Sequence, residues 1–230
     1  LLPMLDEIAR MIELDLNTID AIAVAAGPGS FTGLRIGSAT AKGLGLALDK
    51  PLVHVPTVDA LAYNLYGTDR VICPLMDARR NQVYTGIYEF RNNELSVIEP
   101  QMAVGIEVIA GKLRALGREV VFLGDGVPVF RKALMEELMQ GMDFSFAPAH
   151  LNKQRAGAVA ALAVSYVRAG KIETAAEHRP DYLRPSQAER ERAEKEAREK
   201  AEKAKAEKAE RVEKGKAEEQ KEQKEAGLHE

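Results

Sequence analysis

A strand, a tight turn and a helix are encoded in residues 23–45, AVAAGPGSFTGLRIGSATAKGLG. An apolar run ends at Gly27-Pro28-Gly29, and small and apolar residues then continue to about Leu48. The N–H groups at such a helix start favour an anion, but the loop has neither the Walker pattern G-x-x-x-x-G-K-[ST] nor the dinucleotide pattern G-x-G-x-x-G. We therefore interpret it as a capped turn, with Ser30 or Thr32 as the cap. The residues expected to shape it are Gly27, Pro28, Gly29, Ser30 and Thr32.

Small residues recur at every fourth position of the predicted helix, at Gly33, Gly37, Ala41 and Gly45. Each Gly costs about 1 kcal/mol relative to Ala inside a helix, so we expect this row to have a packing role. A smooth edge lets another backbone approach closely. That backbone belongs either to the chain's own sheet or to a helix of a partner chain, and both interpretations stay open at this point. Phe31, at the mouth of the loop, suits a contact anchor.

The segments around this unit follow a mixed helix and strand pattern. Leu1, Leu5, Ile8 and Ile12 have helical spacing, which predicts a helix that stops near Leu14. PLVHV (51–55) reads as a strand, and Thr57 is expected to cap the next helix. Strands and helices then alternate as far as a helix at 156–170, with a hairpin around Asn92-Asn93. The pattern predicts an α/β protein with a largely parallel sheet that is covered on both faces.

Bulk composition excludes several classes of protein. The formal net charge is −3, so no basic field is available to hold nucleic acid, and the single Cys73 excludes an internal disulfide. We expect Cys73 to be a buried strand thiol. No run reaches membrane-spanning length and no signal peptide is visible, which predicts a cytoplasmic protein without a membrane partner. Residues 187–230 are nearly all Ala, Glu, Lys, Arg and Gln, typical of a single charged helix or a disordered tail.

Three strings carry a resemblance to a known family: LLPMLDEI (1–8), IDAIAVAAGPGSFTGLRIGSATAKGLGLALDKPLVHVPTVDALA (19–62) and VICPLMDARRNQVYTGIYEF (71–90). They resemble the Gcp-like, TsaD-related family of the actin/Hsp70/sugar-kinase (ASKHA) superfamily. FLGDGV and PDYLRPSQAERER match more weakly. The resemblance implies a two-lobe, ribonuclease H-like α/β fold. It divides the chain into a first lobe at 1–67, whose N-terminal strands are expected to be missing, a second lobe at 68–186 and the tail at 187–230.

The resemblance also implies a function. Members of the family's non-catalytic branch support TsaD, which transfers a threonylcarbamoyl group to the N6 of a tRNA adenosine. They pair with TsaD, or with a second copy of themselves, through the first helix and the helix after the Gly loop. The ATPase TsaE joins the complex, and tRNA is contacted only indirectly. On this reading the partner-binding residues are Leu1, Leu5, Ile8, Phe31, Gly33, Leu34, Gly37, Ala41 and Gly45.

The alternative is an enzyme in its own right, either a TsaD-like transferase or a nucleotide-dependent phosphotransferase. The TsaD-like proteins that this chain resembles have an H-x-x-x-H pair that binds a metal. This chain has Thr57 and Leu61 at the matching positions. The four histidines are scattered along the sequence, so we predict no metal site, no cofactor and no catalytic residue. We interpret Asp77 with Arg79 and Arg80, and also Gly124-Asp125-Gly126, as turns rather than as catalytic or nucleotide-binding groups.

Overall fold

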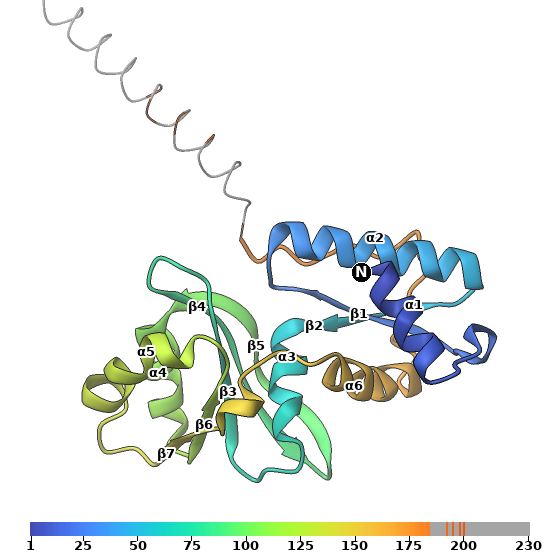
Figure 1. Ribbon diagram of the computed structural model, residues 1–230. Helices are drawn as coiled ribbons and strands as arrows, with labels where there is room; N and C mark the ends of the chain where they lie inside the picture. The colour runs from blue at the N-terminus through green and yellow to red at the C-terminus, as the bar shows by residue number, and fades with distance from the viewer. Residues whose placement is uncertain (185–191, 193–194, 196–197, 199, 201–230) are drawn as a thin grey trace, which may run out of the picture. The chain divides into compact units, whose positions relative to one another are not determined.

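The structure, a computed structural model, describes residues 1–184 together with residues 192, 195, 198 and 200 (Figure 1). The predicted tail at 187–230 therefore lies almost entirely outside the described residues. Residues 1–184 form one compact unit that contains two sheets. Within the described part of the chain, no helix is both long and apolar enough to cross a bilayer.

The first sheet pairs β1 (Ile22–Gly27) with β2 (Leu52–Pro56) in parallel, and helix α2 (Phe31–Leu48) makes the crossover between them. Successive side chains of a strand point to opposite faces, so each strand serves two layers. Val24 and Leu52 pack towards Ala41 of α2. Val53 and Val55 pack towards Leu162 of helix α6 (Ala156–Arg168). The two helices therefore cover the opposite faces of this sheet (Figure 1).

The second sheet has the strand order β5-β4-β3-β6-β7. The strands are β3 (Val71–Asp77), β4 (Gln82–Arg91), β5 (Glu94–Gly105), β6 (Val120–Leu123) and β7 (Phe144–Phe146). One face packs against α4 (Ile106–Leu116) and α5 (Val127–Ala133), which continues into a π-helical turn, η3 (Leu134–Leu138). The other face packs against α3 (Thr57–Ala62), all of whose residues are buried.

The prediction of a largely parallel sheet is wrong for this second sheet. β3 pairs with β6 and β6 with β7 in parallel, but β4 is antiparallel to both β3 and β5. The cause is the length of the connections, because a turn of a few residues can join only antiparallel strands. Asn92 and Asn93 both have positive φ, as a type I′ hairpin turn requires, and the predicted hairpin is confirmed.

Three further expectations can be compared with the structure. Cys73 is a buried strand thiol as predicted, and burial raises its pKa to about 12. Thr57 is the first residue of α3 and not its cap, since Pro56 takes the capping position without a side-chain hydrogen bond. The boundary at 67/68 also differs from the observed packing. Helix α6 lies in the sequence of the second lobe but packs on β1 and β2, because their apolar face needs cover.

Candidate partner-binding surface

Helix α2 has one buried face, formed by Leu34, Ser38, Ala41 and Gly45. This face lies on the first sheet: a Cβ added to Gly45 would stand 3.0 Å from the Leu52 side chain and 3.1 Å from the Lys50 carbonyl oxygen. The prediction that Leu34, Ala41 and Gly45 form part of a partner-binding edge is therefore wrong. Ala41 and Gly45 are small because the chain's own strand and backbone lie against them.

The row of small residues does not stay on one side of the helix. A spacing of four residues advances about 40° beyond a full turn, so three such steps rotate the row by about 120°. Gly33 is exposed and Gly37 half-buried, while Ala41 and Gly45 face the sheet. A Cβ added to Gly37 would meet nothing within 4 Å. The interpretation that the row packs on the chain's own sheet therefore holds for Ala41 and Gly45, and partner contact at Gly33 and Gly37 stays a prediction.

The outward face of α2 contains small residues that the sequence argument missed. Ala39, Gly43 and Ala47 are exposed, and a Cβ on Gly43 would also meet nothing within 4 Å. The large side chains of Ile36 and Leu46 are exposed beside them. The sequence signal for this face is a period of four that begins at Arg35, two residues out of register with the row Gly33, Gly37, Ala41 and Gly45.

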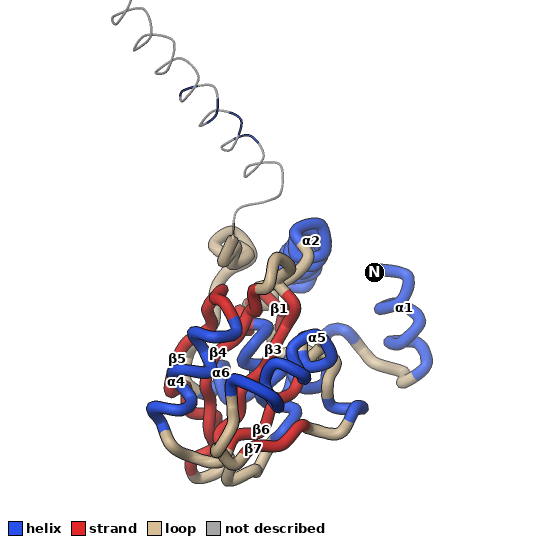
Figure 2. Tube along the Cα trace, turned by 90° about the vertical axis from the view of Figure 1, so that its left-hand side faces the viewer, coloured by secondary structure: helices blue, strands red, loops and turns tan. Residues whose placement is uncertain are grey.

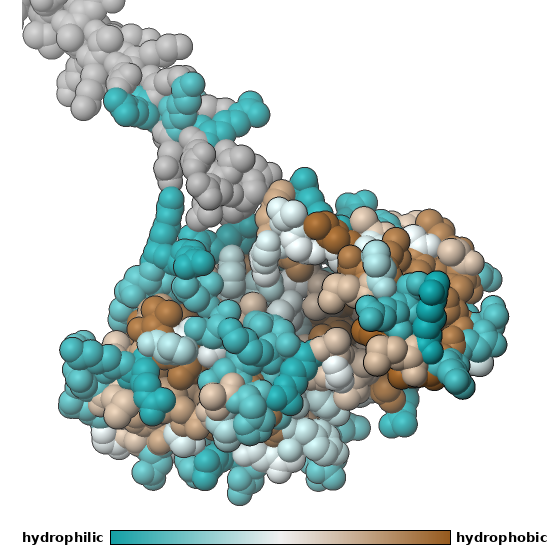
Figure 3. Space-filling view, in the orientation of Figure 1, coloured by the Kyte–Doolittle hydropathy of each residue, from teal (hydrophilic) through white to brown (hydrophobic). Residues whose placement is uncertain are grey.

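Helix α1 (Leu2–Met11) has no buried residue at all. The predicted contact residues Leu1, Leu5 and Ile8 are exposed, as are Leu2, Met4, Met11 and Ile12. Figure 2 shows α1 at the periphery, apart from the layers around the two sheets. In Figure 3, hydrophobic residues gather over the side of the molecule where Figure 1 places α1. Large exposed apolar surface is typical of a protein–protein interaction site, and partner contact at α1 stays a prediction. We call α1 and the outward face of α2, taken together, the helical face.

The Gly loop is covered by the chain itself. Gly27 has φ +127°, and a Cβ there would stand 2.3 Å from the carbonyl oxygen of Asp181. The Asp181 N–H donates to the carbonyl of Ala26 at 2.7 Å. The backbone of Asp181 therefore lies against the loop, and its close approach explains the glycine.

The remaining loop residues have smaller roles. The Ser30 hydroxyl accepts from the N–H of Gly33 at 3.4 Å, so Ser30 and not Thr32 is the cap. Pro28 and Gly29 lead into that turn, and a Cβ on Gly29 would make only an ordinary contact with Leu34. The ring of Phe31 lies 4.9 Å from that of Tyr182 and 4.0 Å from the Arg35 guanidinium carbon. Phe31 already packs within the chain, and its role as a partner contact stays a prediction.

Replacing Gly27 by Ala is expected to lower the free energy of unfolding by more than about 2 kcal/mol, because the backbone around Asp181 must move and the φ is unfavourable for Ala. The matched control is Gly29→Ala, expected to change it by less than about 1 kcal/mol. Urea unfolding followed by circular dichroism measures both. Equal effects in the two variants would show that Asp181 does not constrain the loop.

The turns considered as catalytic or nucleotide-binding are held by structural contacts. Asp77 accepts from the N–H of Arg79 at 2.8 Å and lies 3.5 Å from its guanidinium. A Cβ on Gly124 would stand 2.1 Å from the Leu75 carbonyl oxygen, so this glycine permits close packing of a turn on β3. Thr57 and Leu61 are buried in α3. The histidines are scattered along the sequence, but two of them come together in the fold: the ring centroids of His54 and His178 lie only 5.8 Å apart.

Known proteins similar to this chain were identified from both sequence and structure. A family model described as TsaD, tRNA N6-adenosine threonylcarbamoyltransferase, matches residues 1–192. The tRNA threonylcarbamoyladenosine biosynthesis protein TsaB of Bacillus subtilis is 34% identical over 191 residues, which cover 82% of this chain and 80% of that protein. TsaB of Escherichia coli is 35% identical over 130 residues, 55% of this chain and 56% of that protein.

Among solved structures, an uncharacterized Pseudomonas aeruginosa protein with similarity to peptidase YeaZ superposes with a TM-score of 0.67. It is 27% identical, and the match covers 80% of this chain and 82% of that one. The two-lobe α/β fold that the resemblance implied is confirmed.

Proposed function

This chain belongs to the TsaD family and, within it, to the TsaB proteins of tRNA threonylcarbamoyladenosine biosynthesis, and from this premise we propose that it acts as the accessory subunit that activates TsaD. TsaD carries the transfer chemistry, and this chain supplies a surface that organises TsaD. TsaE completes the complex, and tRNA binds through TsaD. Without TsaD, two copies of the chain pair through the same surface.

The helical face is the observation that carries this proposal. Within the described residues, α1 exposes every large apolar side chain that it has, and α2 adds Ile36 and Leu46. An amphipathic helix without a buried residue gains little from its own fold, so its apolar stripe needs a partner. The exposed Gly33, Gly43 and the half-buried Gly37 would let a partner helix approach closely.

The accessory role, as opposed to catalysis, rests on the residues at the positions of the TsaD-like metal pair. Thr57 and Leu61 take those positions, and both are buried within α3. A Leu side chain offers no ligand atom, and Thr is not among the side chains that usually bind catalytic metals. Metal-assisted transfer of the TsaD type therefore has no ligand pair at this place.

Reconstitution tests the proposal directly. TsaD, TsaE, ATP, threonylcarbamoyl adenylate and substrate tRNA are incubated with and without this chain, and threonylcarbamoyladenosine is measured by mass spectrometry of digested tRNA. We expect product only when TsaD and this chain are both present, and no ATP hydrolysis by the chain alone. Modification or sustained ATP turnover without TsaD would favour the enzyme alternative and overturn the accessory role.

Replacing Gly37 by Leu is expected to weaken association with TsaD and self-association at least tenfold, because the new side chain fills the shallow part of the helical face. The fold should persist, since a Cβ at this position meets nothing within 4 Å. Gly111→Leu in α4 is the matched control, because it makes the same change at another open helical position. Analytical ultracentrifugation reports both associations. A Gly37→Leu chain that still sediments as a dimer and binds TsaD like the control would contradict the contact assignment.

A further inference from the structure

Outside the helical face, three side chains from separate segments converge between β2 and the stretch that follows α6. His54 lies on β2, Glu173 lies in the segment bonded to Leu52, and His178 follows in the next turn. A ligand atom from each, two imidazole nitrogens and a carboxylate oxygen, lies within 4.8 Å of the others. We propose that His54, Glu173 and His178 form a binding site for one divalent transition-metal ion of the zinc type.

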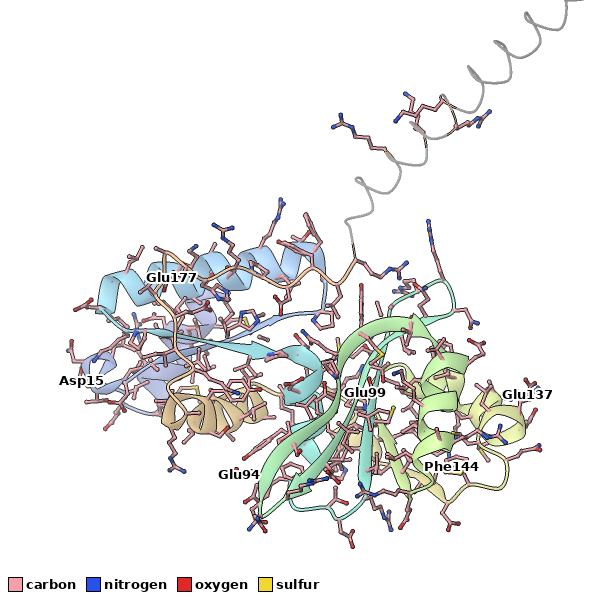
Figure 4. All side chains as sticks on the ribbon, turned by 180° about the vertical axis from the view of Figure 1, so that it is seen from behind. Asp15, Glu94, Glu99, Glu137, Phe144 and Glu177 are labelled. Atoms are coloured by element: carbon pink, nitrogen blue, oxygen red, sulfur yellow. The ribbon has the colours of Figure 1, made fainter. Side chains whose placement is uncertain are left out.

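The backbone holds these residues in place. Leu52 and Glu173 exchange two hydrogen bonds, at 2.8 and 2.9 Å, which fix Glu173 beside β2. Glu177, labelled in Figure 4, closes the next turn. Its carboxylate accepts from both the N–H and the hydroxyl of Thr174. Lys42 of α2 donates to the His178 carbonyl at 3.0 Å. Ligands held by fixed backbone lose little freedom when an ion binds.

The separations between ligand atoms suit a tetrahedral ion after small side-chain rotations. Metal–ligand bonds of about 2.0–2.1 Å place ligand atoms about 3.3 Å apart. Here Glu173 Oε1 lies 2.5 Å from His178 Nδ1 and 3.8 Å from His54 Nδ1, so the two distances bracket that value. The ion would replace the proton that the His178–Glu173 pair shares.

A second shell is present around His54. While Nδ1 faces Glu173, Nε2 lies 2.9 Å from Asp181 Oδ2, and Gln101 donates to the same oxygen at 3.4 Å. A carboxylate on the far nitrogen of a histidine fixes the ring and raises its basicity, as it does in most protein metal sites. Glu173 and Asp181 together also balance the charge of a divalent ion.

One further observation points to a ligand. Beside the cluster is a cavity of about 300 Å³, lined by His54, Pro56, Tyr166, Lys171, Ile172 and Glu173. It offers an entry path and room for a water molecule as the fourth ligand. Two imidazoles with one carboxylate favour zinc over magnesium, which prefers oxygen ligands.

The test is zinc binding by the full chain after treatment with a chelator. Competition with a chromophoric chelator is expected to give one Zn²⁺ per chain with Kd below about 1 μM, and Mg²⁺ should not compete. His54→Asn and Glu173→Gln should each weaken binding more than tenfold, and Asp181→Asn by about 10–100-fold. His150→Asn, at a histidine away from the cluster, is the matched control and should bind like the parent chain.

Thermal unfolding provides a second readout and checks that the variants fold. Zn²⁺ should raise the Tm of the parent chain and of His150→Asn, but not that of His54→Asn or Glu173→Gln. If either of those variants fails to fold, Asp181→Asn and the zinc X-ray absorption spectrum of the parent chain, expected to show two imidazoles, decide the question. Absence of binding at 100 μM zinc, or equal binding by His54→Asn and the parent chain, would overturn the site and leave a His–Glu hydrogen-bonded pair.

Discussion

Replacing Ile8 and Ile36 together by Glu is expected to weaken binding to TsaD at least 100-fold and to abolish TsaD-dependent modification of tRNA. Ile8 is 53% exposed on α1 and Ile36 is 52% exposed on α2, so neither contributes much to the chain's own core. Burying two carboxylates in an apolar interface would cost several kcal/mol, and a factor of 100 corresponds to about 2.7 kcal/mol. Affinity is measured by isothermal titration calorimetry, and product is measured in the reconstituted reaction.

A matched control separates this effect from a general effect of added charge. Val108 of α4 and Val129 of α5 are 50% and 58% exposed, so Val108→Glu with Val129→Glu adds the same charge at the same exposure elsewhere. This control should bind TsaD and support modification like the parent chain. Equal loss in both double variants, or full binding by Ile8→Glu/Ile36→Glu, would show that the helical face is not where TsaD docks.

Replacing Asp59 by Ala is expected to lower the free energy of unfolding by about 3 kcal/mol. The buried Asp59 carboxyl of α3 accepts from the Tyr88 hydroxyl at 2.7 Å and from the Tyr166 hydroxyl at 3.1 Å. It therefore joins α3 to β4 of the second sheet and to α6, the helix that covers one face of the first sheet. The Ala variant leaves both phenols without this acceptor, and each unpaired buried hydroxyl costs about 1–3 kcal/mol. Urea unfolding followed by circular dichroism measures the loss.

Asp59→Asn is the matched variant for this network. Its amide can accept from one phenol and donate to the other, so we expect a change below about 1 kcal/mol. If Asp59→Asn lowers the free energy of unfolding as much as Asp59→Ala does, the charge of Asp59 matters and its hydrogen bonds do not.

Comparison of the wild type with Asp59→Asn also gives a pH prediction. Burial raises the pKa of Asp59 above its ordinary value of 3.8, although its hydrogen bonds with Tyr88 and Tyr166 oppose the shift. The folded state then binds the proton more tightly than the unfolded state does. Stability from this group is full below pH 3.8 and is lost as the pH rises through the raised pKa. The wild-type free energy of unfolding, relative to that of Asp59→Asn, should therefore fall over this range. A difference that stays flat or rises with pH would contradict the shift.

Local sequence was enough to predict most elements of the fold. The strand, Gly turn and helix of residues 22–48 form as expected, with Ser30 as the cap, because each depends on neighbouring residues alone. The Asn92-Asn93 hairpin and the amphipathic α1 are local in the same sense. The resemblance carried by these strings predicted the two-lobe fold and the family correctly.

Tertiary structure decided which residues of a row face the chain and which face outward. Ala41 and Gly45 belong to the core and Gly43 to the surface, a distinction that depends on where the sheet lies around a helix whose turn is not four residues long. It also decided that α6 returns to the first sheet and that His54 meets Glu173 and His178 more than a hundred residues later. Those contacts arise because the apolar face of β1 and β2 and the open edge of β2 must be covered. Spacing along the sequence does not show which distant segment covers them.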